Sequence, residues 1–249
     1  VLQSATATAL LLASFAGRGL VTLPVALAIM LGADVGTTLV AQVFAFDVKW
    51  MWAAGMIVGL VLFNASTNDR MKSIGRIAIG LGLMLLALSV LAGVSGAMRE
   101  SPTLKLLLGA LGSEPIIAVI VAAGLTWLAH SSLAIVLFIM SLAASGVVGP
   151  TLGLALVLGA NVGGSVAPYM ALSASPVAAR RVPLGNLVAR LAIAIVLLPF
   201  LSRFASLLGP PSGTTAQLVL NFHTVFNILV AAAFLPLLGP LADIVTKLL

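Results

Sequence analysis

The sequence contains no cysteine and few charged residues. Only 7% of its 249 residues are Asp, Glu, Lys or Arg, whereas 61% are hydrophobic. The absence of cysteine excludes a secreted scaffold held together by disulfides. So few charges exclude both a disordered chain and a water-soluble enzyme, because they cannot cover a solvated surface. The mean hydropathy of +1.26 indicates an integral membrane protein.

Basic residues outnumber acidic ones, but they form no patch. The 12 Lys and Arg against 6 Asp and Glu give a net charge of +6. They are spread along the chain without interleaved aromatic residues, so the sequence does not indicate a nucleic-acid-binding surface. In a membrane protein such charges lie in loops and orient the spans, because basic residues are enriched on the cytoplasmic side.

Four long segments contain no charged residue: 50–68, 77–98, 115–179 and 204–242. At 1.5 Å per residue, each is long enough as a helix to cross a hydrocarbon core of roughly 30 Å. The run Leu-Met-Leu-Leu-Ala-Leu at 83–88 does not alternate as the strands of a membrane β-barrel do. We therefore expect an all-α integral membrane protein.

Two polar motifs each occur twice in the chain, with the same spacing. Gln-Ser-Ala-Thr-Ala at 3–7 aligns with His-Ser-Ser-Leu-Ala at 130–134. In each case a second motif follows at the same interval: Gly-Ala-Asp-Val-Gly-Thr-Thr at 32–38 and Gly-Ala-Asn-Val-Gly-Gly-Ser at 159–165. The equal spacing predicts two structural repeats, as in many transporters.

The segments around the first motif are too short to span a membrane. Residues 116–129 and 133–148 extend only about 21–24 Å as helices, which suits the two arms of a re-entrant hairpin with the serine-rich motif at its tip. The glycines of the second motif permit unwinding. We therefore expect discontinuous helices over 20–46 and 150–175, interrupted near the membrane midplane.

The basic residues predict that the two repeats are inverted. The first repeat comprises residues 1–76 and the second residues 77–249, within one transmembrane domain, and about 50 residues are expected before Val1 by comparison of the two. If the first hairpin returns to the cytoplasm at Arg18, the second opens outward. This topology gives seven basic residues inside, namely Arg18, Arg70, Lys72, Arg76, Arg180, Arg181 and Lys247, and four outside, namely Lys49, Arg99, Lys105 and Arg203.

With these motifs the sequence resembles the type II sodium-dependent phosphate cotransporters and their bacterial sodium/phosphate relatives. That family has a repeated Gln-Ser-Ser-Ser cluster in re-entrant hairpins, each followed by a Gly-Ala-Asn-Ile-Gly-Thr-Thr-like segment, and the segment 221–227 also resembles it. The resemblance implies a multi-pass transporter in the cell membrane, expected to be a bacterial inner membrane. It would couple inorganic phosphate movement to sodium by alternating access, with no other cofactor and with phosphate, sodium and the lipid bilayer as its partners.

The resemblance also assigns site residues by their place in the two motifs. The hairpin tips are expected to bind phosphate, through Gln3, Ser4, Thr6, His130, Ser131 and Ser132. The helix breaks are expected to bind the cation, through Asp34, Thr37, Thr38, Asn161 and Ser165. Sodium ligands are expected among Asp34, Thr37, Asn161 and Ser165. Helix N-termini suit phosphate, and hydroxyl, amide and carbonyl oxygens suit a hard cation.

Departures from the family pattern leave alternatives open. Ala5 and His130 replace a serine and a glutamine of the tips, and Asp34 replaces an asparagine. An isolated carboxylate at the midplane either binds a cation, takes a proton or pairs with a structural partner. Arg190 lies within a span and could pair with an acidic group or draw in the anion, whereas His223 favours an interhelical role.

Other functions fit less well. A proton-coupled or uncoupled exporter of phosphate, of another small oxyanion or of a carboxylate remains the alternative. A channel is a second rival, although two inverted halves favour alternating access. An enzyme is not expected, because the sequence has no nucleophile elbow, zinc-binding or P-loop motif. The small-residue face at Gly80 and Gly82 is compatible with a homodimer as well as with internal packing.

Overall fold

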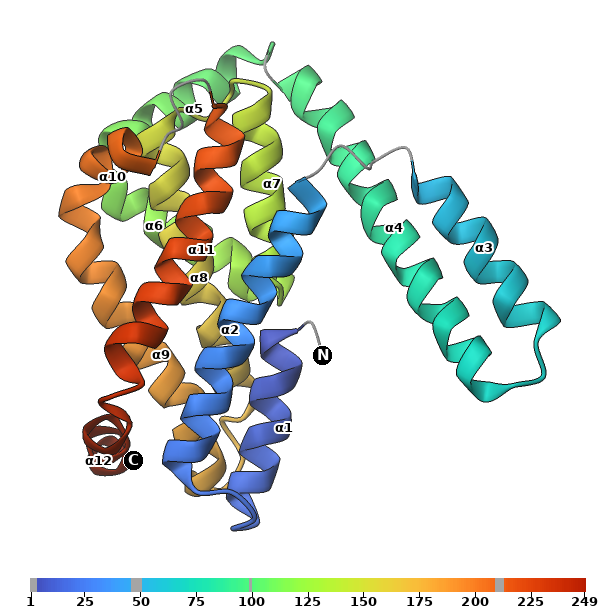
Figure 1. Ribbon diagram of the computed structural model, residues 1–249. Coiled ribbons are helices and arrows are strands. Elements are labelled where there is room, and N and C mark those ends of the chain that lie inside the picture. The colour runs from blue at the N-terminus through green and yellow to red at the C-terminus, as the bar shows by residue number, and fades with distance from the viewer. Residues whose placement is uncertain (1–3, 46–50, 99, 209–212) are drawn as a thin grey trace.

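The structure is a computed structural model that describes residues 4–45, 51–98, 100–208 and 213–249 (Figure 1). This part of the chain is helical and contains no strand. The helices are α1 (Ala5–Gly17), α2 (Leu23–Ala45), α3 (Trp52–Ala65), α4 (Asp69–Met98), α5 (Pro102–Ser113), α6 (Pro115–Ala129), α7 (Ser132–Ala144), α8 (Pro150–Ala171), α9 (Val177–Leu197), η2 (Leu198–Phe200), α10 (Leu201–Leu208), α11 (Thr215–Phe234) and α12 (Leu238–Leu248).

Among the residues that the structure describes, five helical segments are long and apolar enough to cross a membrane. They are Leu23–Val43, Asp69–Val94, Pro150–Ala171, Val177–Leu208 and Thr215–Phe234. Helices α5 and α6 form a further apolar pair that bends by 117° at its junction. These lengths match the thickness of a bilayer, so the prediction of an all-α, multi-pass membrane protein is confirmed.

Helix α8 is the centre of the main bundle. It packs against α6, α7, α9 and α11, and most of its side chains are buried, including Leu154, Leu158 and Asn161. Helices α1 and α2 cover one side, where α1 contacts α9 and α2 contacts α11 (Figure 1). Side chains from both ends of the sequence therefore meet around the middle of α8.

Helices α3 and α4 form an arm that projects from the bundle (Figure 1). They approach closely because glycines face each other: a Cβ atom at Gly59 would lie 2.7 Å from the carbonyl oxygen of Gly75, and one at Gly75 would lie 2.7 Å from that of Gly59. Small residues allow this kind of backbone approach between membrane helices. The arm contacts the bundle through α4 and α7.

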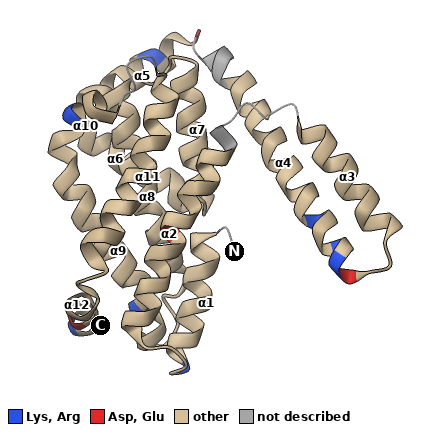
Figure 2. Cartoon of the chain, viewed as in Figure 1, with Lys and Arg blue, Asp and Glu red and all other residues tan. Residues whose placement is uncertain are grey.

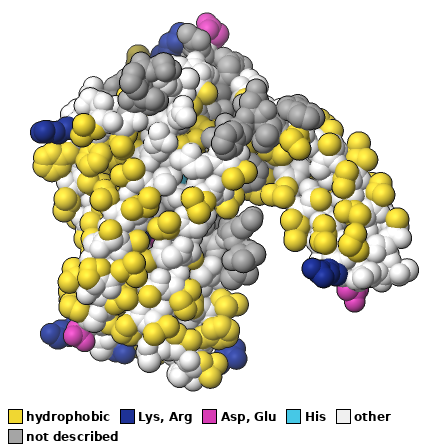
Figure 3. Space-filling model, in the orientation of Figure 1, with side chains coloured by type: hydrophobic (Ala, Val, Ile, Leu, Met, Phe, Trp, Pro, Cys, Tyr) yellow, Lys and Arg dark blue, Asp and Glu magenta, His cyan; other side chains and the backbone are white. Residues whose placement is uncertain are grey.

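Apart from the buried Asp34 and Arg190, the charged residues lie mainly at two ends of the molecule, with apolar helices between them. Figure 2 shows Lys and Arg at both ends, and Figure 3 shows hydrophobic side chains along the flanks of the bundle and the arm. The N-terminal end of α4, the α1–α2 turn and α12 lie at one end, opposite α5 and α10 (Figure 1). This distribution is typical of a protein whose helices cross a bilayer.

The local structure repeats in register with the sequence motifs. Helices α1 and α7 each have 13 residues and begin after a serine N-cap, Ser4 or Ser131, with nearly the same extended backbone conformation. Gly19 and Gly146 follow these helices with φ angles of 72° and 74°. A positive φ suits glycine, which has no Cβ to clash. Equivalent residues therefore start and end equivalent helices.

The predicted discontinuous helices are not observed. Helix α2 continues through residues 32–38, and α8 continues through residues 159–165. In α8 the glycines serve another purpose, because Cβ atoms at Gly159 and Gly163 would collide with the backbone carbonyl oxygens of Val119 and Ala123 in α6. Glycine permits both unwinding and close helix packing, and here it provides close packing.

A substitution at Gly163 should therefore weaken the α6–α8 contact. Gly163→Ala is expected to cost about 1–3 kcal/mol, because the backbone of Ala123 blocks the added methyl group. Gly36→Ala, at the equivalent position of α2, is the matched control, since no atom lies within 4 Å of its Cβ position. Thermal unfolding of both variants in detergent tests this, and equal melting temperatures would contradict the packing role of Gly163.

Candidate functional site

A buried ion pair joins α2 and α9. Arg190 and Asp34 are each only 2% exposed. The Nε of Arg190 donates a hydrogen bond to Oδ2 of Asp34 at 3.1 Å, and its Nη2 lies 2.8 Å from Oδ1. That oxygen accepts no other hydrogen bond among the described residues. The two charges neutralise each other at a depth where either alone would be costly.

The same guanidinium also contacts α8 and α11. Its Nη1 donates to the backbone carbonyl of Asn161 at 2.7 Å, and its Nη2 donates to Oδ1 of Asn227 at 3.0 Å. The three nitrogens together therefore reach partners on three other helices. Arg190 holds four helices together through one planar group, which is the geometry that arginine provides and lysine does not.

An amide network extends from the guanidinium. Asn227 donates through Nδ2 to Oδ1 of Asn161 at 2.9 Å and to the backbone carbonyl of His223 at 2.8 Å. The Nδ2 of Asn161 lies 3.0 Å from Nδ1 of the His223 ring and also donates to the carbonyl of Val157. The side chains of Asn161, His223 and Asn227 are buried. His223 and Asn227 thus have the interhelical role that their spacing on α11 favours.

Two polar atoms beside this network are buried without a hydrogen-bond partner in the described structure. They are Nε2 of His223 and Oδ1 of Asn186. Asn186 precedes Arg190 by about one helical turn and lies beside the Asp34 carboxylate. Sequence reasoning missed Asn186. Its i, i+4 spacing with Arg190 on an otherwise apolar stretch of helix, repeated by His223 and Asn227, was the signal that could have found it.

The hydroxyls predicted to bind a cation lie on the same helices as Asp34 and Asn161, about one turn further along. Thr37 donates to the backbone carbonyl of Asp34 at 2.7 Å. Thr38 and Ser165, which occupy equivalent positions of the two repeats, make equivalent bonds to carbonyls three residues earlier, at 2.8 and 2.7 Å. All three side chains are buried. Their oxygens keep acceptor capacity, and hydroxyl, carboxylate and amide oxygens are ligands that suit a hard cation.

The two predicted tips lie next to each other. The hydroxyl of Ser4 accepts a hydrogen bond from the backbone N–H of Ala7, and that of Ser131 accepts one from Ala134, both at 3.2 Å. Thr6 donates to the carbonyl of His130 at 3.5 Å, so the tip of each motif contacts the other. The serine contacts are the capping bonds expected at a helix N-terminus. Gln3 lies outside the described residues.

The second tip also approaches the ion pair. A Cβ atom at Gly164 would lie 3.2 Å from the hydroxyl oxygen of Ser132 and 3.7 Å from Nη1 of Arg190. Ser132 and Arg190 therefore border the same point on α8. The structure thus places Ser132 of the second predicted tip close to the guanidinium that binds Asp34 and Asn161.

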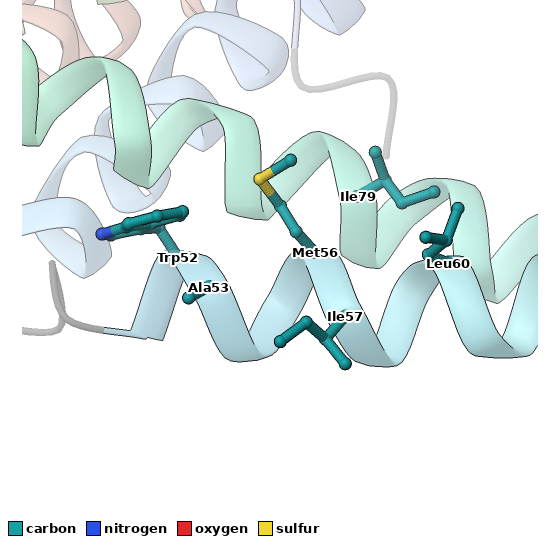
Figure 4. Close-up of a pocket in the computed structure, with 6 residues that line it drawn as sticks. All are labelled: Trp52, Ala53, Met56, Ile57, Leu60 and Ile79. Atoms are coloured by element: carbon teal, nitrogen blue, oxygen red, sulfur yellow. The ribbon is translucent and has the colours of Figure 1, made fainter.

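The groove of about 440 Å³ on the α3–α4 arm is a different kind of surface. Figure 4 shows its lining, which consists of Trp52, Ala53, Met56, Ile57, Leu60 and Ile79. Apart from the indole N–H of Trp52, these side chains provide no group that could hold an anion. The polar cluster around Arg190 is therefore the better candidate for an ion site.

Comparison with known proteins identifies a family and several relatives. A family model described as Na+/Pi-cotransporter matches residues 1–93 and 97–235. The chain is 35% identical over 242 residues to a protein of Escherichia coli (strain K12) named "Putative inorganic phosphate export protein YjbB", covering 97% of the chain and 45% of that protein. It is 26% identical over 238 residues to "Uncharacterized protein YqeW" of Bacillus subtilis (strain 168), covering 95% of the chain and 77% of that protein.

A protein of the same YjbB name in Salmonella typhimurium is 35% identical over 236 residues, with coverage of 95% and 44%. The chain thus spans less than half the length of the YjbB proteins that it matches. No solved structure matches the chain.

Loss of the arginine should destabilise the protein more than loss of both charges. Arg190→Leu leaves the Asp34 carboxylate buried without a counter-ion, which is expected to cost about 3–5 kcal/mol. The double variant Asp34→Leu/Arg190→Leu should recover part of that loss, because no buried charge remains. Thermal unfolding in detergent measures both, with the exposed Arg203→Leu as the control. An Arg190→Leu variant that melts like the wild type would contradict the ion pair.

Proposed function

The chain belongs to the Na+/Pi-cotransporter family, and from that premise we propose that the protein moves inorganic phosphate across the membrane by sodium-coupled alternating access. The observation that carries this proposal is the convergence of two serine-capped helix ends and a buried arginine on the middle of α8. Such a site suits a small oxyanion. A membrane-embedded ionisable cluster is by default a functional site.

Phosphate is proposed to bind at the two tips. The N-terminal ends of α1 and α7 carry partial positive charge, and backbone N–H groups there favour an anion. Thr6 of the first tip donates a hydrogen bond to the carbonyl of His130 in the second, and Ser4 and Ser131 cap the two helices. With Gln3 and Ser132, these are the residues proposed to contact phosphate. Their hydroxyls supply neutral donors beside a single guanidinium.

The two halves are proposed to be inverted repeats with re-entrant hairpins. Helices α1 and α7 have 13 residues each, or about 20 Å, which is too short to cross the hydrocarbon core. Figure 1 supports the inversion, because α1 runs from mid-height towards one end of the bundle and α7 runs from mid-height towards the other. Such symmetry supports alternating access to a site between the halves.

Sodium is proposed to bind between α2 and α8. Asp34 and Asn161 occupy equivalent positions of the two repeats, and the Thr37 and Ser165 hydroxyls lie about one helical turn from them. Oxygen ligands of this kind suit a hard cation. Proton-coupled or uncoupled export of phosphate is the second candidate, because the YjbB relatives are named for phosphate export. The expected homodimer stays a prediction.

Uptake of labelled phosphate into proteoliposomes tests the proposal. An inward sodium gradient at fixed pH should drive phosphate accumulation, whereas an equal potassium gradient should not, because the proposed ion site is specific for the coupling cation. Phosphate movement driven only by a pH step would support proton coupling instead. The absence of phosphate movement under every gradient, in either direction, would overturn the proposed function.

A further inference from the structure

Among the charged residues that the structure describes, only Asp34 and Arg190 have buried side chains. Their charges cancel, so the site is neutral as it stands. An anion that approached Arg190 alone would place two negative groups on one guanidinium. A cation that approached Asp34 alone would leave Arg190 without its counter-ion. Either event leaves an uncompensated charge in a medium of low dielectric constant, which is strongly unfavourable.

Simultaneous binding of both ions avoids this cost. If an oxygen of monoanionic phosphate, H₂PO₄⁻, replaces the carboxylate on Arg190 and a sodium ion replaces the guanidinium on Asp34, two compensated pairs take the place of one. Arginine is well suited to this exchange, because its planar group pairs with a carboxylate or a phosphate in the same way. The carboxylate of Asp34 therefore stands in for the anion when the site holds no substrate.

Different groups lie beside Arg190 and beside Asp34, so one side of the ion pair suits the anion and the other suits the cation. On the anion side, Nη1 of Arg190 and the hydroxyl of Ser132 both lie within 4 Å of the point where a Cβ of residue 164 would be. Glycine at that position adds no side-chain atom to the space between the hairpin tip and the guanidinium. Phosphate at the tips thus has a short path to Arg190.

On the cation side, the side-chain oxygen of Asn186 makes no hydrogen bond to the rest of the described chain in this arrangement. Its Oδ1 is buried, with the residue only 3% exposed, and it has no hydrogen-bond partner among the described residues. The side chain lies beside Asp34. A buried acceptor without a partner is costly and calls for an explanation. The Asn186 amide faces Asp34 as a hydrogen-bond donor, and rotation of that amide would turn Oδ1 to a cation held by the carboxylate.

We propose that Arg190 binds phosphate and that Asp34 and Asn186 bind the coupling sodium ion. Each ion binds by separating the same Asp34–Arg190 ion pair. This inference rests on the proposed function and explains its coupling. Binding of one ion favours binding of the other, because each removes the partner that the other must displace. Couplings of this kind change affinities by roughly 5–150-fold.

The Asp34→Asn variant tests the exchange. In the wild type, sodium should tighten labelled-phosphate binding to the purified protein by at least about fivefold. In Asp34→Asn the guanidinium of Arg190 is no longer paired with a carboxylate. Sodium is then not needed to free the guanidinium, so phosphate should bind equally well with and without sodium. Phosphate exchange across proteoliposomes should persist, whereas sodium-driven accumulation should be lost. The exposed Asp69→Asn should behave like the wild type.

A second variant keeps the test decisive if Asp34→Asn does not fold. Asn186→Ala retains the ion pair and should raise the sodium concentration for half-maximal phosphate uptake several-fold. Arg190→Gln should abolish phosphate binding with or without sodium. An Asn186→Ala variant with the sodium dependence of the wild type would overturn the role of Asn186.

The outcomes separate this inference from the proposed function. If the wild type neither binds nor moves phosphate in the presence of sodium, the proposed function fails. If wild-type uptake is driven by sodium but Asp34→Asn keeps the same sodium dependence of phosphate binding, the function stands and the ion-pair exchange is wrong. If Asp34→Asn removes a pH dependence in place of a sodium dependence, the exchange stands and the proposed sodium is wrong.

Discussion

The ion pair between Asp34 and Arg190 is the interaction on which the centre of the bundle depends. It links α2 to α9, and the remaining donors of the guanidinium extend the contact to α8 and α11. Apolar residues would join these helices as well or better, since replacing a buried ion pair by hydrophobic side chains is often neutral or stabilising. A charged pair at this depth therefore indicates a functional requirement, and the proposed ion binding would provide one.

The two repeats contribute unequally to this centre. Equivalent positions carry Asp34 in one half and Asn161 in the other, and Arg190 binds the carboxylate of the first and the backbone carbonyl of the second. The local framework is nevertheless the same in both halves, because Thr38 and Ser165 make the same hydrogen bond within their helices. Two locally equivalent helices thus carry a charged residue at one position and a neutral residue at the equivalent one. The negative charge therefore lies on α2 only.

Much of the fold could be predicted from the sequence, because the low charge and the equally spaced pairs of motifs both have direct structural consequences. Asp34 was also predictable as a special residue, since an isolated carboxylate in an apolar helix is rare. The pairing of Asp34 with Arg190 was not predictable, because the two residues are 156 positions apart and only the packing of α2 against α9 brings them together. The glycines at 159 and 163 were misinterpreted as helix breaks, since unwinding and close packing favour the same residue.

The most direct test of this account is an experimental structure of the protein with phosphate and sodium bound. The account predicts a phosphate oxygen about 2.7–2.9 Å from a guanidinium nitrogen of Arg190, between the two serine tips, with Asp34 turned towards a sodium ion and no longer paired with the arginine. A structure with phosphate bound elsewhere and the Asp34–Arg190 pair intact would contradict it.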